Sequence, residues 1–269
     1  MLLDAGADVN QARTNEYATT VKYNTSYKPG NIAIGMNTLT TGESSISIGS
    51  NAAGNGGSAT SIGYNSDATG NGATALGAYA QAVAIGAVAI GGAGQDPTSS
   101  NNLQGQGADA EGQNSVAIGK GSTAIGYGSV AINGTARGST NNGAADISSV
   151  AVGNGAIINP NAFGGVAIGD GALCGYNSED RKNAIAIGAA SSCFNTGGIA
   201  IGRTASVSGG ASNSNGTFNV AIGQQASVSG TSATSNSVAL GYAASVTTAN
   251  TIRLGNTSIS SLLLSLIHI

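Results

Sequence analysis

The chain has 269 residues, of which 44 are glycine and only 8% are charged, and its net charge is −3. Its nine lysines and arginines form no basic stripe, which argues against a nucleic-acid-binding protein. Tryptophan is absent, tyrosine and phenylalanine together number eleven (8 + 3), and no run of 18 apolar residues occurs, so we expect neither a thick hydrophobic core nor a membrane-spanning helix.

Residues 1–29 precede the periodic part of the chain and are expected to be a lead-in segment. The string LLDAGADVN (residues 2–10) resembles the end of an ankyrin repeat, but one partial repeat cannot bury a core. Asp4 and Asp8 interrupt the apolar residues near the start, so no export signal is recognisable. For an exported protein, we expect the signal to lie outside this sequence.

From residue 31 a short string of the form apolar–small–apolar–glycine recurs at a fixed spacing. We call the residue that ends each string its closing position. Up to residue 133 the closing positions keep a constant 14-residue step, at Gly35, Gly49, Gly63, Gly77, Gly91, Gly105, Gly119 and Asn133. A register kept over seven steps indicates a regular structural repeat.

Beyond residue 133 the same string continues at unequal spacing, with steps of 14 residues or more. The closing positions are Gly153, Gly169, Gly188, Gly202, Gly223, Gly241 and Gly255. No step is shorter than the regular one, so we predict that the same unit carries insertions here. We expect these insertions to lie in loops on one edge of a solenoid.

Each repeat predicts two short strands joined by a tight turn. Val, Ile or Leu stands one and three residues before the closing position, usually with Ala between them, as in Val116, Ala117 and Ile118. This alternation with a period of two is typical of a strand. Small or apolar residues three and five positions after the closing position predict a second, inward-facing strand. The closing position and the second residue after it favour positive φ.

The predicted fold class is therefore all-β, a parallel β-roll or β-solenoid of 14-residue coils stacked about 4.8 Å apart. We expect the β-roll over residues 30–250, with regular coils at 31–133 and insertion-bearing coils at 134–250. Residues 251–263 end the repeat block, and residues 264–269 (LSLIHI) resemble a translated library adapter and are expected to be a non-native tail. A core of Ala, Ser, Val and Ile is thin, so we expect other chains to contribute to its stability.

The string NSVAIGKGS (residues 114–122) resembles the head-repeat motif of trimeric autotransporter adhesins, the YadA-like head. The resemblance implies a left-handed β-roll, a homotrimer, and a non-enzymatic head that faces outward from the bacterial outer membrane. It also implies binding to host or extracellular-matrix proteins such as collagen. An alternative is the repeat shaft of a phage tail fibre or a related surface fibre, because TANTIRLGNTSIS (residues 248–260) resembles the end of repeat blocks in such fibres.

The resemblance makes the polar residues of this motif candidates for contact with a partner, since the family's motif is linked to binding of matrix proteins. These candidates are Asn114, Ser115, Lys120 and Ser122. The alternative interpretation is that the motif recurs because every coil needs its Val, Ile and Gly for packing and turn geometry.

Cys174 and Cys193 both lie five residues after a closing position, in successive coils. They therefore share an inward column, and we expect them to be nearly stacked, close enough for a disulfide. The alternative is two buried free thiols that replace the Val found further along the chain. Two cysteines without a nearby histidine are too few for a zinc site.

The insertion NSEDRKN (residues 177–183) concentrates four charged residues, Glu179, Asp180, Arg181 and Lys182. It is either a recognition loop that projects from the solenoid or a solvated loop without a partner. The single histidine, His268, leaves no recognisable catalytic triad, acid–base pair or metal cluster. We therefore expect no enzymatic activity and no cofactor.

Overall fold

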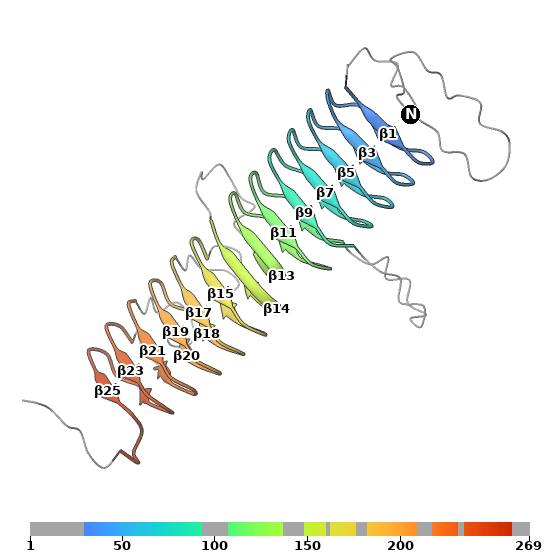
Figure 1. Ribbon diagram of the computed structural model, residues 1–269. Coiled ribbons are helices and arrows are strands. Elements are labelled where there is room, and N and C mark those ends of the chain that lie inside the picture. Colours follow the sequence, from blue (N-terminus) through green and yellow to red (C-terminus); the bar gives the residue numbers. More distant parts are fainter. Residues whose placement is uncertain are drawn as a thin grey trace, which may run out of the picture. The chain divides into compact units, whose positions relative to one another are not determined.

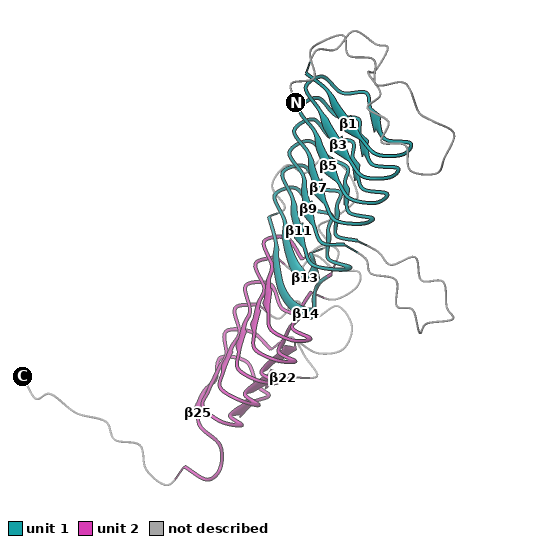
Figure 2. Cartoon of the chain, turned by 45° about the vertical axis from the view of Figure 1, so that its right-hand side comes forward, with its two compact units in different colours: residues 1–158 teal, residues 159–269 magenta. Residues whose placement is uncertain are grey.

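The computed structural model describes residues 30–92, 107–136, 148–159, 162–175, 182–208, 217–230 and 234–259. They belong to two compact units, residues 1–158 and 159–269, which Figure 2 shows in teal and magenta. Every regular element in the described ranges is a strand, and no helix there is long and apolar enough to span a membrane. The lead-in segment 1–29 and the expected tail 264–269 lie outside the described residues.

Each unit is a stack of coils that follow one another in chain order (Figure 1). A coil consists of a first strand that leads to the closing position, a first turn, a second strand, and a second turn that leads to the next coil. The strands are short because the apolar–small–apolar alternation lasts only three residues before glycine interrupts it.

In residues 1–158 the first strands are β1 (Ile32–Ile34), β3 (Ile46–Ile48), β5 (Thr60–Ile62), β7 (Thr74–Leu76), β9 (Val88–Ile90) and β11 (Val116–Ile118). The second strands are β2 (Leu39–Thr40), β4 (Ala53–Gly54), β6 (Asp67–Ala68), β8 (Gln81–Ala82), β10 (Asp109–Ala110) and β12 (Thr123–Ala124). The longer strands β13 (Val130–Ala136) and β14 (Val150–Ile158) run through both parts of their coils.

In residues 159–269 the first strands are β15 (Val166–Ile168), β17 (Ile185–Ile187), β19 (Ile199–Ile201), β21 (Val220–Ile222), β23 (Val238–Leu240) and β25 (Ile252–Leu254). The second strands are β16 (Leu173–Cys174), β18 (Ser192–Cys193), β20 (Ser206–Ser208), β22 (Ser227–Ser229) and β24 (Ser245–Val246).

Equivalent strands of successive coils pair in parallel and in register. Strand β1 pairs with β3, which places Ile32 beside Ile46, and β17 pairs with β19, which places Ile185 beside Ile199. The spacing of these partners along the chain is the repeat length that the sequence predicts. The predicted all-β fold, a parallel β-solenoid or β-roll, is confirmed.

The interior of each coil is filled by small side chains. The alanines in the middle of the first strands, such as Ala117 and Ala221, are fully buried, as are the residues three and five positions after the closing positions, such as Ala80 and Ala82. This confirms the predicted inward columns. The apolar residues of the column five positions after the closing position that are larger than alanine are Ile158, Cys174, Cys193, Val207, Val228 and Val246, and all of them are buried.

The first turn has positive φ at the two positions where the sequence predicts it. Gly63 closes its coil with a φ of 142°, and the second residue after it, Asn65, has a φ of 51°. In other coils Tyr79, Thr204 and Ala243 occupy the latter position, also with positive φ. The stack therefore imposes the left-handed conformation even on residues that rarely adopt it alone.

The predicted coil that would close at Gly105 is not part of the stack. Gly105 fits the 14-residue spacing, but strand β9 before Gly91 pairs directly with β11 before Gly119. The amide of Ala108 donates to the carbonyl of Gly91, so the second strand of that coil, β10, begins only after residues 93–106. The physical reason is that Asn102, Leu103 and Gln104 lack the apolar–small–apolar pattern of a first strand.

The remaining insertions lie outside the described residues, but the strands on either side give their places in the chain. In chain order, residues 137–147, 176–181, 209–216 and 231–233 all fall between a second strand and the next first strand, which is the second turn. Residues 93–106 instead follow a closing position and belong to the first turn. Both placements leave strand pairing intact on either side, because a turn can lengthen without changing register.

Candidate binding surfaces

The outward side of the first strands is a largely aliphatic surface within each unit, interrupted by Thr60 and Thr74, and we call it the first-strand face. It consists of the Val, Ile and Leu residues one and three positions before each closing position. In residues 1–158 Ile62 and Ile90 are 36% and 38% exposed, and in residues 159–269 Ile222 and Leu240 are 36% and 44% exposed. These side chains point away from the alanine interior, so a single chain leaves them partly in water.

The motif at residues 114–122 does not form one cluster of accessible polar groups. Ser115 and Ser122 are fully buried. The Ser122 hydroxyl donates to the carbonyl of Ile118 at 2.6 Å, so it serves the turn of its own coil. Neither serine can touch an external partner in this conformation, which leaves Asn114 and Lys120 as the accessible members of the four candidates.

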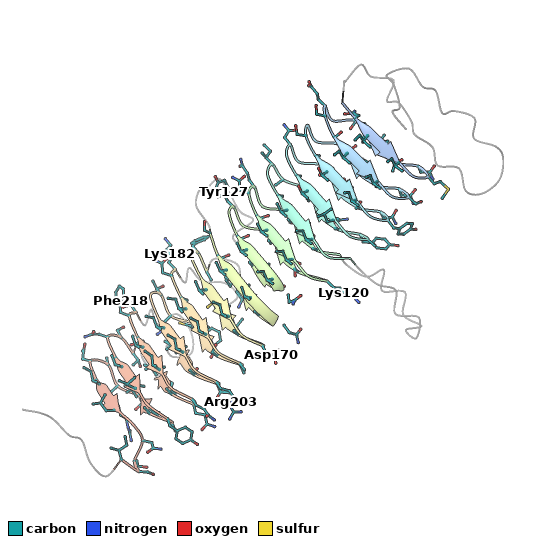
Figure 3. The ribbon with its side chains drawn as sticks, in the orientation of Figure 1. Lys120, Tyr127, Asp170, Lys182, Arg203 and Phe218 are labelled. Carbon is teal, nitrogen blue, oxygen red and sulfur yellow. The ribbon has the colours of Figure 1, made fainter. Side chains whose placement is uncertain are left out.

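Asn114 and Lys120 lie on opposite edges of their coil, because strand β11 separates them. Asn114 belongs to the second turn, and its side-chain amide donates to the Tyr127 hydroxyl of the next coil at 3.4 Å. Lys120 directly follows Gly119 and belongs to the first turn. Figure 3 shows Tyr127 and Lys120 at opposite ends of the coils. The two accessible candidates therefore cannot belong to one compact site.

Each edge carries exposed side chains that the sequence analysis did not single out. On the second-turn edge of residues 1–158, Val83, Ile85 and Tyr127 are 48%, 54% and 41% exposed. On the first-turn edge, the rings of Tyr64 and Tyr79 meet edge to face with centroids 5.3 Å apart. These residues can be recognised in the sequence, because they are apolar or aromatic at turn positions that hold Ser, Asn or Gly in most coils.

Cys174 and Cys193 are direct partners in the pairing of β16 with β18, and both are fully buried free thiols. The Cys174 thiol donates to the carbonyl of Val166 at 3.0 Å. Burial raises the pKa of both thiols, and proximity of the two sulfurs raises that of Cys174 further. The predicted stacking in one inward column is therefore present.

Of the charged insertion, only Lys182 lies within the described residues; Glu179, Asp180 and Arg181 lie outside them. The Lys182 ammonium sits 5.8 Å from the centre of the Phe163 ring, a cation–π contact. Phe218, on the same edge of this unit (Figure 3), is 68% exposed. Whether the insertion recognises a partner stays a prediction.

Two carboxyl groups on the outward side of the second strands have unusual surroundings. In Asp67 and Asp109 one carboxylate oxygen is buried and has no hydrogen-bond partner. Burial raises the pKa of Asp67, and burial together with the charge and hydrogen bond of Glu111 raises the pKa of Asp109 to about 6. Across the described ranges, no three His, Cys, Asp or Glu residues come close enough together to hold a metal ion.

The coils match a known repeat family. The model of the YadA head domain repeat matches residues 32–52, 55–80, 68–93, 105–122, 110–132 and 235–258, which include coils of both units. Among curated proteins, none matches the chain. One solved structure, the collagen-binding domain of the Yersinia adhesin YadA, is 25% identical; the match covers 68% of this chain and 88% of that one, with a TM-score of 0.47. The coils within the matched ranges are therefore similar to YadA head repeats, and this similarity supports a YadA-like head.

Proposed function

We propose that this chain is the head of a homotrimeric adhesin at the bacterial surface, where it binds a host or extracellular-matrix protein and holds that binding surface away from the cell. The head acts without catalysis in this proposal. The observation that carries it is the first-strand face, which leaves aliphatic side chains in both units partly exposed, up to 38% at Ile90 and 44% at Leu240.

The energetic argument starts from the thin interior. Alanine and serine contribute little apolar area to the core, so each coil gains little hydrophobic stabilisation from its own packing. Parallel sheets are normally covered on both faces, and extended exposed aliphatic surfaces mark protein interfaces. If three copies pack together through their first-strand faces, these aliphatic side chains are buried. The family resemblance supports a trimer over other oligomers.

With the first-strand faces buried, the turn edges are the surfaces that remain for a partner. They repeat at the strand spacing of about 4.8 Å, which suits an extended partner such as collagen that contacts several coils in succession. Asn114 with Tyr127 lies on one edge and Lys120 on the other. We propose these edges, rather than the motif as a whole, as the contact surface.

Multi-angle light scattering on the full chain tests the assembly. We expect three times the mass of one chain. Ile222→Asp places a charge in the first-strand face and should yield monomer, whereas Ser227→Asp, on the second strand of the same coil, should remain trimeric. A folded monomer of the unchanged chain would refute the trimer.

Surface plasmon resonance against immobilised collagen, fibronectin and laminin tests the binding. Because both side chains lie on the proposed contact edges, Asn114→Ala and Lys120→Ala should each weaken binding by about fivefold or more. Ser227→Ala is the control, because Ser227 lies on a second strand and not on either turn edge. A trimer that binds none of these proteins would favour the alternative of a fibre shaft.

A further inference from the structure

We propose that Cys174 and Cys193 form a disulfide that cross-links two successive coils while the chain folds. The pairing of β16 with β18 places the two residues directly beside each other on adjacent parallel strands. The strand spacing of about 4.8 Å lies within the Cα separation of roughly 4.4–6.8 Å that disulfides span. Both side chains point into the same fully buried column.

One neighbouring residue, Gly198, leaves room for the Cys193 sulfur because it has no side chain. A Cβ atom at Gly198 would lie 2.7 Å from the Cys193 sulfur. Gly198 occupies the place four residues before a closing position. The same place holds glycine in one other coil of this unit (Gly165) and a side chain in others, such as Ala184 and Ser237. The loss of a side chain there leaves space beside the sulfur, which any larger residue would fill.

The position of the bond also explains its structural benefit. The two cysteines enclose one complete coil, which consists of the second turn with residues 176–181, strand β17 and the first turn after it. The bond therefore closes a loop that includes the charged insertion. Closure of a longer chain segment costs more conformational entropy when the chain folds. A covalent link between β16 and β18 removes that freedom from the unfolded chain.

The chemistry is thiol–disulfide exchange with a disulfide oxidant, such as oxidised glutathione or the disulfide of an oxidoreductase. The thiolate of one cysteine attacks the oxidant, forms a mixed disulfide and releases one oxidant thiol. The thiolate of the other cysteine then attacks the protein sulfur, which forms the Cys174–Cys193 bond and releases the second oxidant thiol. The two cysteines lose two protons, and two electrons reduce the oxidant.

The bond forms before the coils close. Both sulfurs are sealed inside the folded stack, and burial raises the pKa of both thiols, so almost no thiolate is present to react at neutral pH. Oxidant present during refolding should therefore produce the disulfide, whereas oxidant added to the folded, reduced chain should not. The redox state of the pair is fixed by the conditions under which the chain folds.

The full chain is refolded from denaturant with oxidised glutathione, then denatured, alkylated and digested with trypsin. Cleavage after Arg181 and Lys182 separates the two cysteines, so the bond appears as one cross-linked peptide pair. We expect this pair as the main product, and a melting temperature on the order of 5–10 °C above that of the chain refolded with reductant. The double variant Cys174→Val with Cys193→Val should melt at the same temperature under both conditions.

A matched control moves one thiol by one coil. Cys193→Val combined with Val207→Cys keeps two thiols in the same buried column, but two coils apart, at roughly 9.6 Å, which is too far for a disulfide. This variant should be alkylated at both cysteines. Alkylation of both cysteines in the unchanged chain, or equal cross-linking in the control, would overturn the proposal.

Discussion

At the scale of single residues, the first turn places the strictest demand on side-chain size. Gly188 has a φ of 132°, and a Cβ atom there would lie 2.5 Å from the carbonyl oxygen of Gly202 in the next coil. Gly171, two residues after its closing position, has a φ of 63° and open space around a Cβ atom. Glycine is therefore needed at Gly188 because there is no room for a Cβ atom. At Gly171 it is needed only because of the positive φ.

We therefore expect Gly188→Ala to lower the free energy of unfolding by more than about 2 kcal/mol, since it combines backbone strain with a clash against backbone atoms. Gly171→Ala should cost only about 1–2 kcal/mol, the ordinary penalty of a left-handed conformation. Urea denaturation at one protein concentration measures both. Equal losses would mean that the close stacking of the coils at Gly188 is not a constraint on the fold.

A single residue, Asp109, also makes the free energy of unfolding depend on pH. Its pKa, raised to about 6 from 3.8 by burial and by Glu111, means that the folded chain holds a proton that the unfolded chain releases. The resulting stabilisation is full below about pH 4 and is lost as the pH rises through 6. Asp109→Asn should therefore raise the free energy of unfolding at pH 7.5, by on the order of 1 kcal/mol because half-exposed charges are screened.

The same substitution should flatten the change in stability between pH 4 and 7. Asp170→Asn removes an exposed carboxyl group in a first turn and serves as the control. If the free energy of unfolding of Asp109→Asn depends on pH in the same way as that of the unchanged chain, Asp109 does not cause the pH dependence.

At the scale of the element, strand identity follows from a pattern only three residues long. The alternation in Val116, Ala117 and Ile118 predicts a strand, and the stack places Ala inside and the two aliphatic residues outside. Insertions are absorbed by turns, because strand pairing fixes which residues meet and leaves turn length free. The spacing alone could not exclude Gly105, since an insertion as long as one repeat imitates one additional coil.

At the scale of the whole molecule, a repeat stack should tolerate the loss of a complete coil but not the loss of its register. Deletion of residues 50–63 removes one repeat length and joins Gly49 to Tyr64, so that inward and outward positions stay matched. We expect a melting temperature within about 5 °C of that of the unchanged chain, because each coil contacts only its neighbours.

Deletion of residues 50–64 leaves a coil that is one residue too short, and no step between closing positions in the chain is that small. A slip of one residue exchanges the buried and outward side chains of a strand. The melting temperature of this variant should fall by more than roughly 10 °C, as followed by circular dichroism. Equal stability of the two deletions would mean that the 14-residue register does not specify this fold.

Patterns in the chain were enough to predict the repeat, the parallel all-β coil, the inward columns and the stacking of Cys174 on Cys193. These features depend on local alternation and on spacing, which are visible in one chain. The tertiary structure decided that Ser115 and Ser122 are buried, that strand β11 separates Asn114 from Lys120, and that β9 pairs with β11 across residues 93–106. These features depend on which coil stacks on which and on how each turn points its side chains, and neither follows from residue type at a given spacing.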